Sequence, residues 1–135
     1  MDTNPPSGRP GVFTFRDLHV WKLSRSLSAD VYRACSSPKL RPHYAFCDQM
    51  GRAALSVPSN IAEGNDRSSN KDALNFLRIA RGSLAELETQ LWIAHDVGWL
   101  DAETYHRLCE KRCEVERMLG GLIRVRQQRL KVDQA

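Results

Sequence analysis

The sequence predicts an all-α protein, a single-domain antiparallel bundle of four helices that run up, down, up and down. Apolar residues recur at steps of three and four along four successive segments, the spacing of one face of an α-helix. Short polar connections separate these segments, which makes antiparallel neighbours the simplest topology. No stretch alternates apolar and polar residues in the period of two that marks a β-strand. A chain of 135 residues has the size of one compact domain.

The first helix is predicted over about Phe15 to Cys35, after an arm of residues 1–12 that is rich in proline and glycine and should be flexible. The helix should end where Pro38 enters the following loop, because proline lacks the amide hydrogen and restricts the residue before it. The apolar stripe of this helix consists of Val20, Leu23, Leu27, Val31 and Ala34.

The second helix is predicted over about Tyr44 to Glu63. Pro58 lies inside its apolar stripe, yet the stripe continues in phase to Ile61, so we expect a kink at Pro58 and not a helix end. Gly64 and Asn65 then offer the left-handed residues that commonly terminate a helix.

The third helix should begin near Ser69, whose hydroxyl is a favourable N-cap, and Asp72 places a carboxylate in the positive first turn. We expect this helix to end at Gly98. Its stripe keeps the near-heptad spacing of bundle packing through Leu74, Leu77, Ala80, Leu84, Leu87, Leu91 and Ala94.

The fourth helix should be capped by Asp101 and run to about Arg126 or beyond, with Arg112 as a charged interruption of its apolar stripe. Residues 127–135 are polar and are predicted to form a frayed tail. The predicted bundle therefore spans residues 13–126. The stripe itself consists of Tyr105, Leu108, Val115, Leu119 and Leu122.

Composition favours a protein of the cytoplasm. No apolar run approaches the roughly 20 residues that span a bilayer, and the N-terminus lacks the basic start and apolar stretch of a secretory signal. We therefore expect no membrane partner and free thiols at all four cysteines. The formal net charge of +4 favours contact with polyanions, although an ordinary soluble surface accounts for it equally well.

One long central segment runs from Asp48 to Gly64 and reads DQMGRAALSVPSNIAEG. It resembles the hallmark stretch of the 23S ribosomal RNA intervening-sequence protein family. The resemblance extends to Phe15-Arg16-Asp17-Leu18 and Trp21, to Arg67 and Ser69, and to the stretch from Phe76 to Leu87, and covers roughly Phe13 to Leu122.

The resemblance implies a small four-helix bundle that assembles as a homo-oligomer, a pentameric ring, and has no catalytic activity. Members of this family are often encoded within insertions in ribosomal RNA genes, and related bundles serve as accessory proteins of diversity-generating retroelements, so the implied partner class is RNA or a nucleoprotein. Gly51 stands where the family commonly has another residue, often a basic one. If that residue touches nucleic acid in relatives, this chain has lost one contact.

Six polar residues of the central segments form a candidate structural or interface cluster. Arg52 is placed to bridge Asp48 on its own helix and Glu86 across an antiparallel neighbour, which is most simply a structural ion pair. The others lie near the kink and the following turn, where capping of free backbone groups competes with a binding surface as their role. The six are Asp48, Arg52, Asn60, Glu63, Arg67 and Glu86.

Basic residues gather on the third helix and near the C-terminus. Repeated around a symmetry axis, they would form a rim that follows a phosphate backbone; taken singly, they are an ordinary solvated face. A structural or protein-interaction scaffold with no nucleic-acid role is therefore the competing hypothesis. The nucleic-acid-binding candidates are Arg78, Arg81, Arg124, Arg126 and Arg129, with Lys131 beside them.

Nothing in the sequence predicts an enzyme. It contains no glycine-rich phosphate loop, nucleophile elbow or zinc-protease signature, so we expect no catalytic residue, no cofactor and no small-molecule substrate. His106, Cys109 and Cys113 share one helical face, but a fourth ligand is missing, and a Glu103/His106 pair alone does not make a di-iron site. We therefore expect no metal.

Trp92 is the candidate for a contact between subunits. It follows Leu91 of the third stripe, so it should point away from the core of its own bundle.

Overall fold

The computed structural model describes residues 13–134, and these form four α-helices and one short 3-10 helix with no strand among them. The all-α four-helix prediction is confirmed. The elements are η1 (Phe15–Asp17), α1 (His19–Cys35), α2 (Tyr44–Asn65), α3 (Asn70–Asp96) and α4 (Ala102–Gln134).

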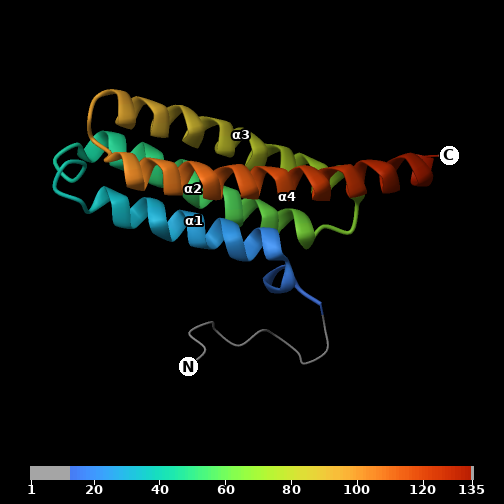
Figure 1. Ribbon diagram of the computed structural model, residues 1–135. Coiled ribbons are helices and arrows are strands. Elements are labelled where there is room, and N and C mark those ends of the chain that lie inside the picture. The colour runs from blue at the N-terminus through green and yellow to red at the C-terminus, as the bar shows by residue number, and fades with distance from the viewer. Residues whose placement is uncertain (1–12, 135) are drawn as a thin grey trace.

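The four helices pack in a ring of neighbours. α2 lies against α1 and α3, and α4 closes the arrangement against α3 and α1. Figure 1 shows successive helices running back and forth, with the C-terminal part of α4 projecting beyond the other three. The α1–α2 and α3–α4 connections therefore lie at one end of the bundle, and the α2–α3 connection lies at the other.

The first helix begins later than expected, and the fourth continues beyond Arg126. Thr14 and Asp17 close a separate 3-10 turn, because the Thr14 hydroxyl accepts from Arg16 N–H and Asp17 accepts from Thr14 N–H. Leu18 is extended, and α1 starts only at His19. α4 continues beyond Arg126, so residues 127–134, the stretch predicted as a frayed polar tail, are helical. No proline or glycine follows Gly121 to stop it.

The helix-terminating role predicted for Gly64 and Asn65 is also wrong. Both residues lie inside α2, and among residues 13–134 only Gly98, which follows α3, has a positive φ, of 80°. Gly64 instead allows close packing against α3. A Cβ on Gly64 would lie 3.1 Å from the Ala73 carbonyl oxygen and 3.2 Å from Leu77 Cδ2.

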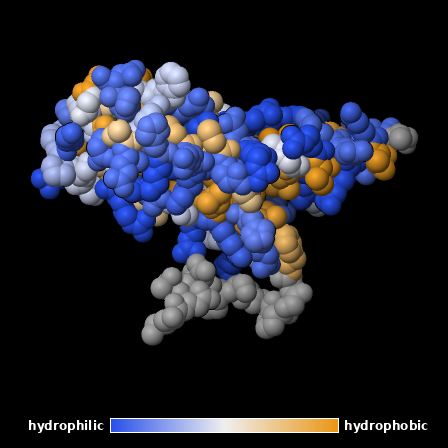
Figure 2. Space-filling view, in the orientation of Figure 1, coloured by the Kyte–Doolittle hydropathy of each residue, from blue (hydrophilic) through white to orange (hydrophobic). Residues whose placement is uncertain are grey.

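One contiguous apolar core runs the length of the bundle. Every residue of the predicted α3 stripe is buried, and Leu27, Met50, Ile61 and Leu119 contribute fully buried side chains from the other helices. None of the helices that the structure describes is both long and apolar enough to cross a membrane. Figure 2 shows that the face in view is largely hydrophilic, with small apolar patches along the C-terminal part of α4.

Pro58 lies buried inside α2, and a neighbouring helix satisfies the carbonyl that it leaves free. Proline has no amide hydrogen to give to the carbonyl of Ala54, four residues earlier. The Ser28 hydroxyl of α1 donates to this Ala54 oxygen at 2.7 Å and also lies 3.0 Å from the Ser24 oxygen. α2 is a single helix across Pro58, and the kink stays a prediction.

Ser28→Ala should lower the free energy of unfolding by about 1–3 kcal/mol, because it leaves the buried Ala54 carbonyl without a donor. Ser59→Ala is the matched control. Its hydroxyl donates to the Leu55 oxygen on an exposed surface, where water replaces the lost donor, so we expect a change within about 0.5 kcal/mol. Urea unfolding followed by circular dichroism measures both, and equal losses would contradict the role of Ser28.

Candidate functional site

Within the described chain, some arginines pair with carboxylates and other basic residues do not. In α1, α2 and α4, five arginines form ion pairs with carboxylates: Arg33 with Asp30, Arg52 with Asp48, Arg67 with Glu63, Arg112 with Glu88 and Glu116, and Arg117 with Glu114. Within residues 13–134, no ion pair forms at Arg78, Arg81, Arg124, Arg129 or Lys131.

Two contacts set the register between α3 and α4. Arg126 Nη1 donates to Asn70 Oδ1 at 3.0 Å, and Arg112 Nη2 lies 2.9 Å from Glu88 Oε2. The helices are therefore antiparallel, and Arg78 lies level with about residue 120 of α4, where Gly120 presents no side chain. Arg124 follows about 6 Å further along α4.

Four cations without a carboxylate partner in the described chain consequently lie at successive levels along the α3–α4 pair. They are Arg78, Arg81, Arg124 and Lys131, which we name the α3–α4 basic surface. All four are exposed. Arg124 and Lys131 are seven residues apart, about two turns, and both line a shallow hollow with Gln127, Gln128 and Val132. One guanidinium, two amides and one ammonium group therefore line this part of α4.

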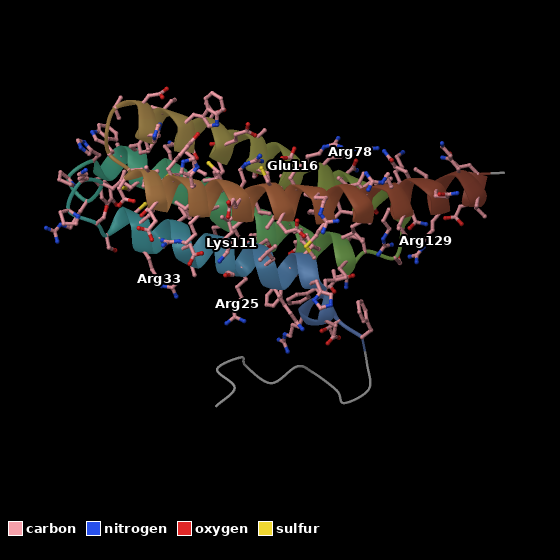
Figure 3. All side chains as sticks on the ribbon, in the orientation of Figure 1. Arg25, Arg33, Arg78, Lys111, Glu116 and Arg129 are labelled. Atoms are coloured by element: carbon pink, nitrogen blue, oxygen red, sulfur yellow. The ribbon has the colours of Figure 1, made fainter. Side chains whose placement is uncertain are left out.

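The other two predicted arginines do not belong to that surface. Arg126 is half-buried against Asn70, whose Nδ2 donates to Asp133 Oδ2 at 2.8 Å, so Arg126 packs the α2–α3 connection onto α4. Burial, followed by the charge of Arg129, lowers the pKa of Arg126. Figure 3 shows Arg129 on the opposite side of α4 from Arg78. The five predicted arginines thus divide between two faces.

The residues of the predicted polar cluster form four separate hydrogen-bonded pairs, of which three join side chains four positions apart and the fourth joins Asn60 to Ser56. Arg52 Nε pairs with Asp48 at 3.0 Å, whereas Glu86 accepts from Gln90 at 3.4 Å. The predicted bridge from Arg52 to Glu86 is absent among the described residues. Arg67 pairs with Glu63 at 2.9 Å, and its guanidinium carbon lies 4.6 Å from the Phe76 ring centroid.

Asn60 supports the α2–α3 interface. Its amide donates to the Ser56 carbonyl at 2.8 Å and to the Ser56 hydroxyl at 2.9 Å, while the Ser83 hydroxyl of α3 lies 2.8 Å from the Ser56 hydroxyl. This network joins two helices close to Pro58. The geometry favours backbone support over ligand binding as the role of Asn60.

Arg112, which interrupts the apolar stripe of α4, is buried. Its side chain is 5% exposed and pairs with Glu88 at 2.9 Å and Glu116 at 2.8 Å. Burial alone lowers the pKa of Arg112, but the hydrogen bond and charge of Glu116, with the charge of Glu88, raise it overall. Sequence reasoning missed this cluster, although Glu116 stands one helical turn after Arg112.

The four cysteines are present as thiols in distinct surroundings. Cys35 and Cys47 face each other across the α1–α2 corner, with each sulfur 4.0 Å from the other residue's carbonyl oxygen. Burial, and then the hydrogen bond and charge of Cys47, raise the pKa of Cys35 to about 12. Cys113 is exposed on α4. Residues 13–134 contain no group of three side chains placed to hold a metal ion.

Iodoacetamide at pH 8 should therefore modify Cys113 before Cys35. A thiol with a pKa of about 12 carries almost no thiolate at pH 8, and the thiolate is the reactive form. Because the pKa of Cys35 is raised, its reaction rate should keep increasing about tenfold per pH unit well above pH 9. Mass spectrometry of peptides over a time course measures both rates, and faster labelling of Cys35 would contradict this burial.

Trp92 lies outside the core, as its place beside the stripe predicted. It is 56% exposed, and its neighbour Ile93 is 46% exposed. Leu55 of α2 and Ile79 of α3 are likewise about half exposed. A role of Trp92 between subunits stays a prediction.

Gly51 is buried beneath the ring of Tyr32. A Cβ on Gly51 would lie 2.9 Å from Tyr32 Cε1, so glycine lets α1 and α2 approach each other here. Packing therefore accounts for the glycine, and the loss of a nucleic-acid contact at this position stays a hypothesis.

Comparison with curated proteins finds no match. Among solved structures, the chain is similar to a protein of unknown function from the S23 ribosomal protein family of Bacteroides thetaiotaomicron, with a TM-score of 0.71 and 21% identity over 77% of this chain and 97% of that one. At this identity the likeness shows the fold. Residues 16–121 match the family described as 23S rRNA-intervening sequence protein. The chain therefore belongs to the 23S rRNA-intervening sequence protein family.

Proposed function

We propose that this chain is a non-catalytic RNA-binding protein that acts as a homo-oligomer and contacts phosphates through the α3–α4 basic surface. One observation carries the proposal. The four cations of this surface have no carboxylate partner in the described chain, whereas Arg33, Arg52, Arg67, Arg112 and Arg117 are paired with carboxylates. Unpaired guanidinium groups bind phosphate oxygens through two parallel hydrogen bonds, and they lose no existing ion pair in doing so.

The dimensions of the surface suit a nucleic-acid backbone. Arg81 lies level with about residue 117 of α4, and Lys131 lies about 14 residues beyond, so the cations extend over about 20 Å. A strand places several consecutive phosphates along that length. The absence of aromatic side chains among the four cations favours contact with the backbone over stacking with bases.

Assembly would multiply this surface. Five apolar side chains of α2, α3 and the turn after α3 are each about half exposed, so each has surface that an interface could cover: Leu55, Ile79, Trp92, Ile93 and Val97. Their burial between copies of the chain would offset the cost of association. The family resemblance implies five copies, each bringing its own four unpaired cations.

The same apolar residues favour a second function, a protein-interaction scaffold with no nucleic-acid role. The two functions differ in the behaviour of the basic surface. A scaffold that assembles through Trp92 and its neighbours is insensitive to the loss of charge at Arg78 and Arg81.

Charge removal at Arg78 and Arg81 tests the proposal. Arg78→Gln/Arg81→Gln should weaken binding of structured RNA by the purified, nuclease-treated protein about a hundredfold or more, because each of the two lost charge-assisted hydrogen bonds is worth roughly 1.5 kcal/mol or more. Arg41→Gln/Arg52→Gln removes the same charge outside α3 and α4 and should change binding little. Filter retention and fluorescence anisotropy report the affinities, and circular dichroism verifies folding. Equal losses in the two variants would contradict a specific surface.

A further inference from the structure

A second cationic site lies at the other end of the bundle, where the α1–α2 and α3–α4 connections meet. A hollow of about 380 Å³ opens there, within the size range of small-ligand pockets. It is lined by the end of α1, both connections and the first turns of α4. Figure 1 places this end away from the projecting C-terminal part of α4. The residues that bear on its chemistry are Arg33, Lys39, Trp99, Asp101, Thr104 and Arg107.

Three cations from three elements line this hollow. Within the described chain, Lys39 of the α1–α2 loop and Arg107 of α4 form no ion pair. Arg33 lies 3.0 Å from Asp30, but that carboxylate also pairs with Lys111 at 2.6 Å. Part of the charge of Arg33 therefore remains uncompensated, and all three cations are exposed to an incoming ligand.

The one carboxylate in the lining is already engaged. Asp101 Oδ1 accepts from Thr104 N–H at 2.7 Å and so caps α4. This hydrogen bond, and then the charges of Lys39 and Arg107, lower the pKa of Asp101. The charges of both cations therefore reach Asp101, whose carboxylate already accepts the hydrogen bond that caps α4. An anion that enters the hollow meets three positive charges and one negative charge.

Trp99 supplies a fixed aromatic wall. Its ring stacks on His43 with centroids 3.6 Å apart, and Phe46 meets it edge-on at 5.3 Å. The Trp99 backbone N–H also donates to the Ala94 carbonyl at 2.8 Å. The indole is therefore held in place before any ligand arrives, which lowers the entropy cost of binding. Leu100 and Ala34 are buried beside it and make the floor apolar.

We propose that this hollow binds a nucleoside monophosphate, with the phosphate between Lys39 and Arg107 and the base against the Trp99 wall. Cations recognise the phosphate, and an aromatic face accepts any base. The ligand is either a free nucleotide or the terminal nucleotide of a phosphorylated RNA strand. The site is separate from the α3–α4 basic surface and does not depend on the proposed function of that surface.

Calorimetry with adenosine 5′-monophosphate, adenosine and inorganic phosphate tests this site. We expect the monophosphate to bind at least tenfold more tightly than either fragment, because only it engages both the cations and the indole. Lys39→Gln/Arg107→Gln should weaken this binding at least tenfold, whereas Arg78→Gln/Arg81→Gln, with the same charge change at the other surface, should leave it unchanged. Trp99→Leu should remove the advantage of the monophosphate over inorganic phosphate, provided that circular dichroism shows an intact fold.

The source of the nucleotide follows from a second comparison. We compare a short RNA that carries a 5′-phosphate with the same RNA that carries a 5′-hydroxyl. Tighter binding of the phosphorylated RNA, lost in Lys39→Gln/Arg107→Gln, identifies a strand end as the ligand. If the two RNAs bind equally and the monophosphate also binds, the ligand is the free nucleotide. No heat from the monophosphate at millimolar concentration, equal affinity for inorganic phosphate, or binding unaffected by Lys39→Gln/Arg107→Gln would each overturn the proposal. None of these results bears on RNA binding through Arg78 and Arg81.

Discussion

Replacing Glu88 and Glu116 together by glutamine should lower the free energy of unfolding by about 2–3 kcal/mol. The substitution keeps the shape of both side chains but leaves the Arg112 guanidinium, whose side chain is 5% exposed, without a countercharge. Removing one side of a buried ion pair costs 3–5 kcal/mol in typical cases. We expect somewhat less here because the two glutamates are about half exposed and water already screens them.

Arg112→Met is the matched control for this prediction. It removes the charge and fills the same space with an apolar side chain, which is often neutral or stabilising when a buried ion pair is replaced. Urea unfolding at one fixed protein concentration compares the variants. A loss in Arg112→Met as large as in Glu88→Gln/Glu116→Gln would mean that the ion pairs themselves stabilise the bundle, contrary to this account.

Gly64→Leu should destabilise the protein by about 3 kcal/mol, because the new side chain must displace α3 from α2. The first atom added already lies 3.1 Å from the backbone oxygen of Ala73, and backbone cannot move as a flexible side chain does. The α2–α3 packing, the most extensive in the bundle, would have to open at this point.

Gly82→Leu makes the same chemical change at a helical glycine with open space around it. Apart from the adjoining residues and backbone of its own helix, no atom lies within 4 Å of a Cβ at Gly82, and glycine in a helix interior costs up to about 1 kcal/mol. We therefore expect Gly82→Leu to leave the melting temperature unchanged or raise it, and Gly64→Leu to lower it by several degrees. Similar melting temperatures for the two variants would show that close packing at Gly64 is not what selects glycine.

The helices were predictable because each carries its apolar stripe in local sequence. The α3 stripe, from Leu74 to Ala94, repeats at steps of three and four and is buried throughout. The errors arose where a local signal has two meanings. Gly64 looks like a helix terminator, but its neighbours Ala73 and Leu77 approach only through tertiary packing. The separate turn at Thr14 was readable from its capping box with Asp17, a signal that the apolar stripe obscured.

The candidate site was predictable as a set of residues but not as a surface. Composition and spacing show that Arg78, Arg81 and Arg124 avoid the apolar stripes. Whether each has a carboxylate partner depends on the register of α3 against α4, which no local pattern encodes. The same register brings Glu88 to Arg112, so the buried ion pair was hidden for the same reason.

The central claim, RNA binding by unpaired cations repeated in an oligomer, is tested most directly by RNA affinity across a salt series. Light scattering in the same buffers gives the mass of the assembly. We expect an oligomer whose RNA affinity falls steeply with salt. In Arg78→Gln/Arg81→Gln, the magnitude of the slope of log affinity against log salt should decrease by about 1.4–1.8 for each copy in contact with RNA, because each copy loses two phosphate contacts. An oligomer that retains no RNA at about 50 mM salt, or one with the same slope in both proteins, would contradict the account.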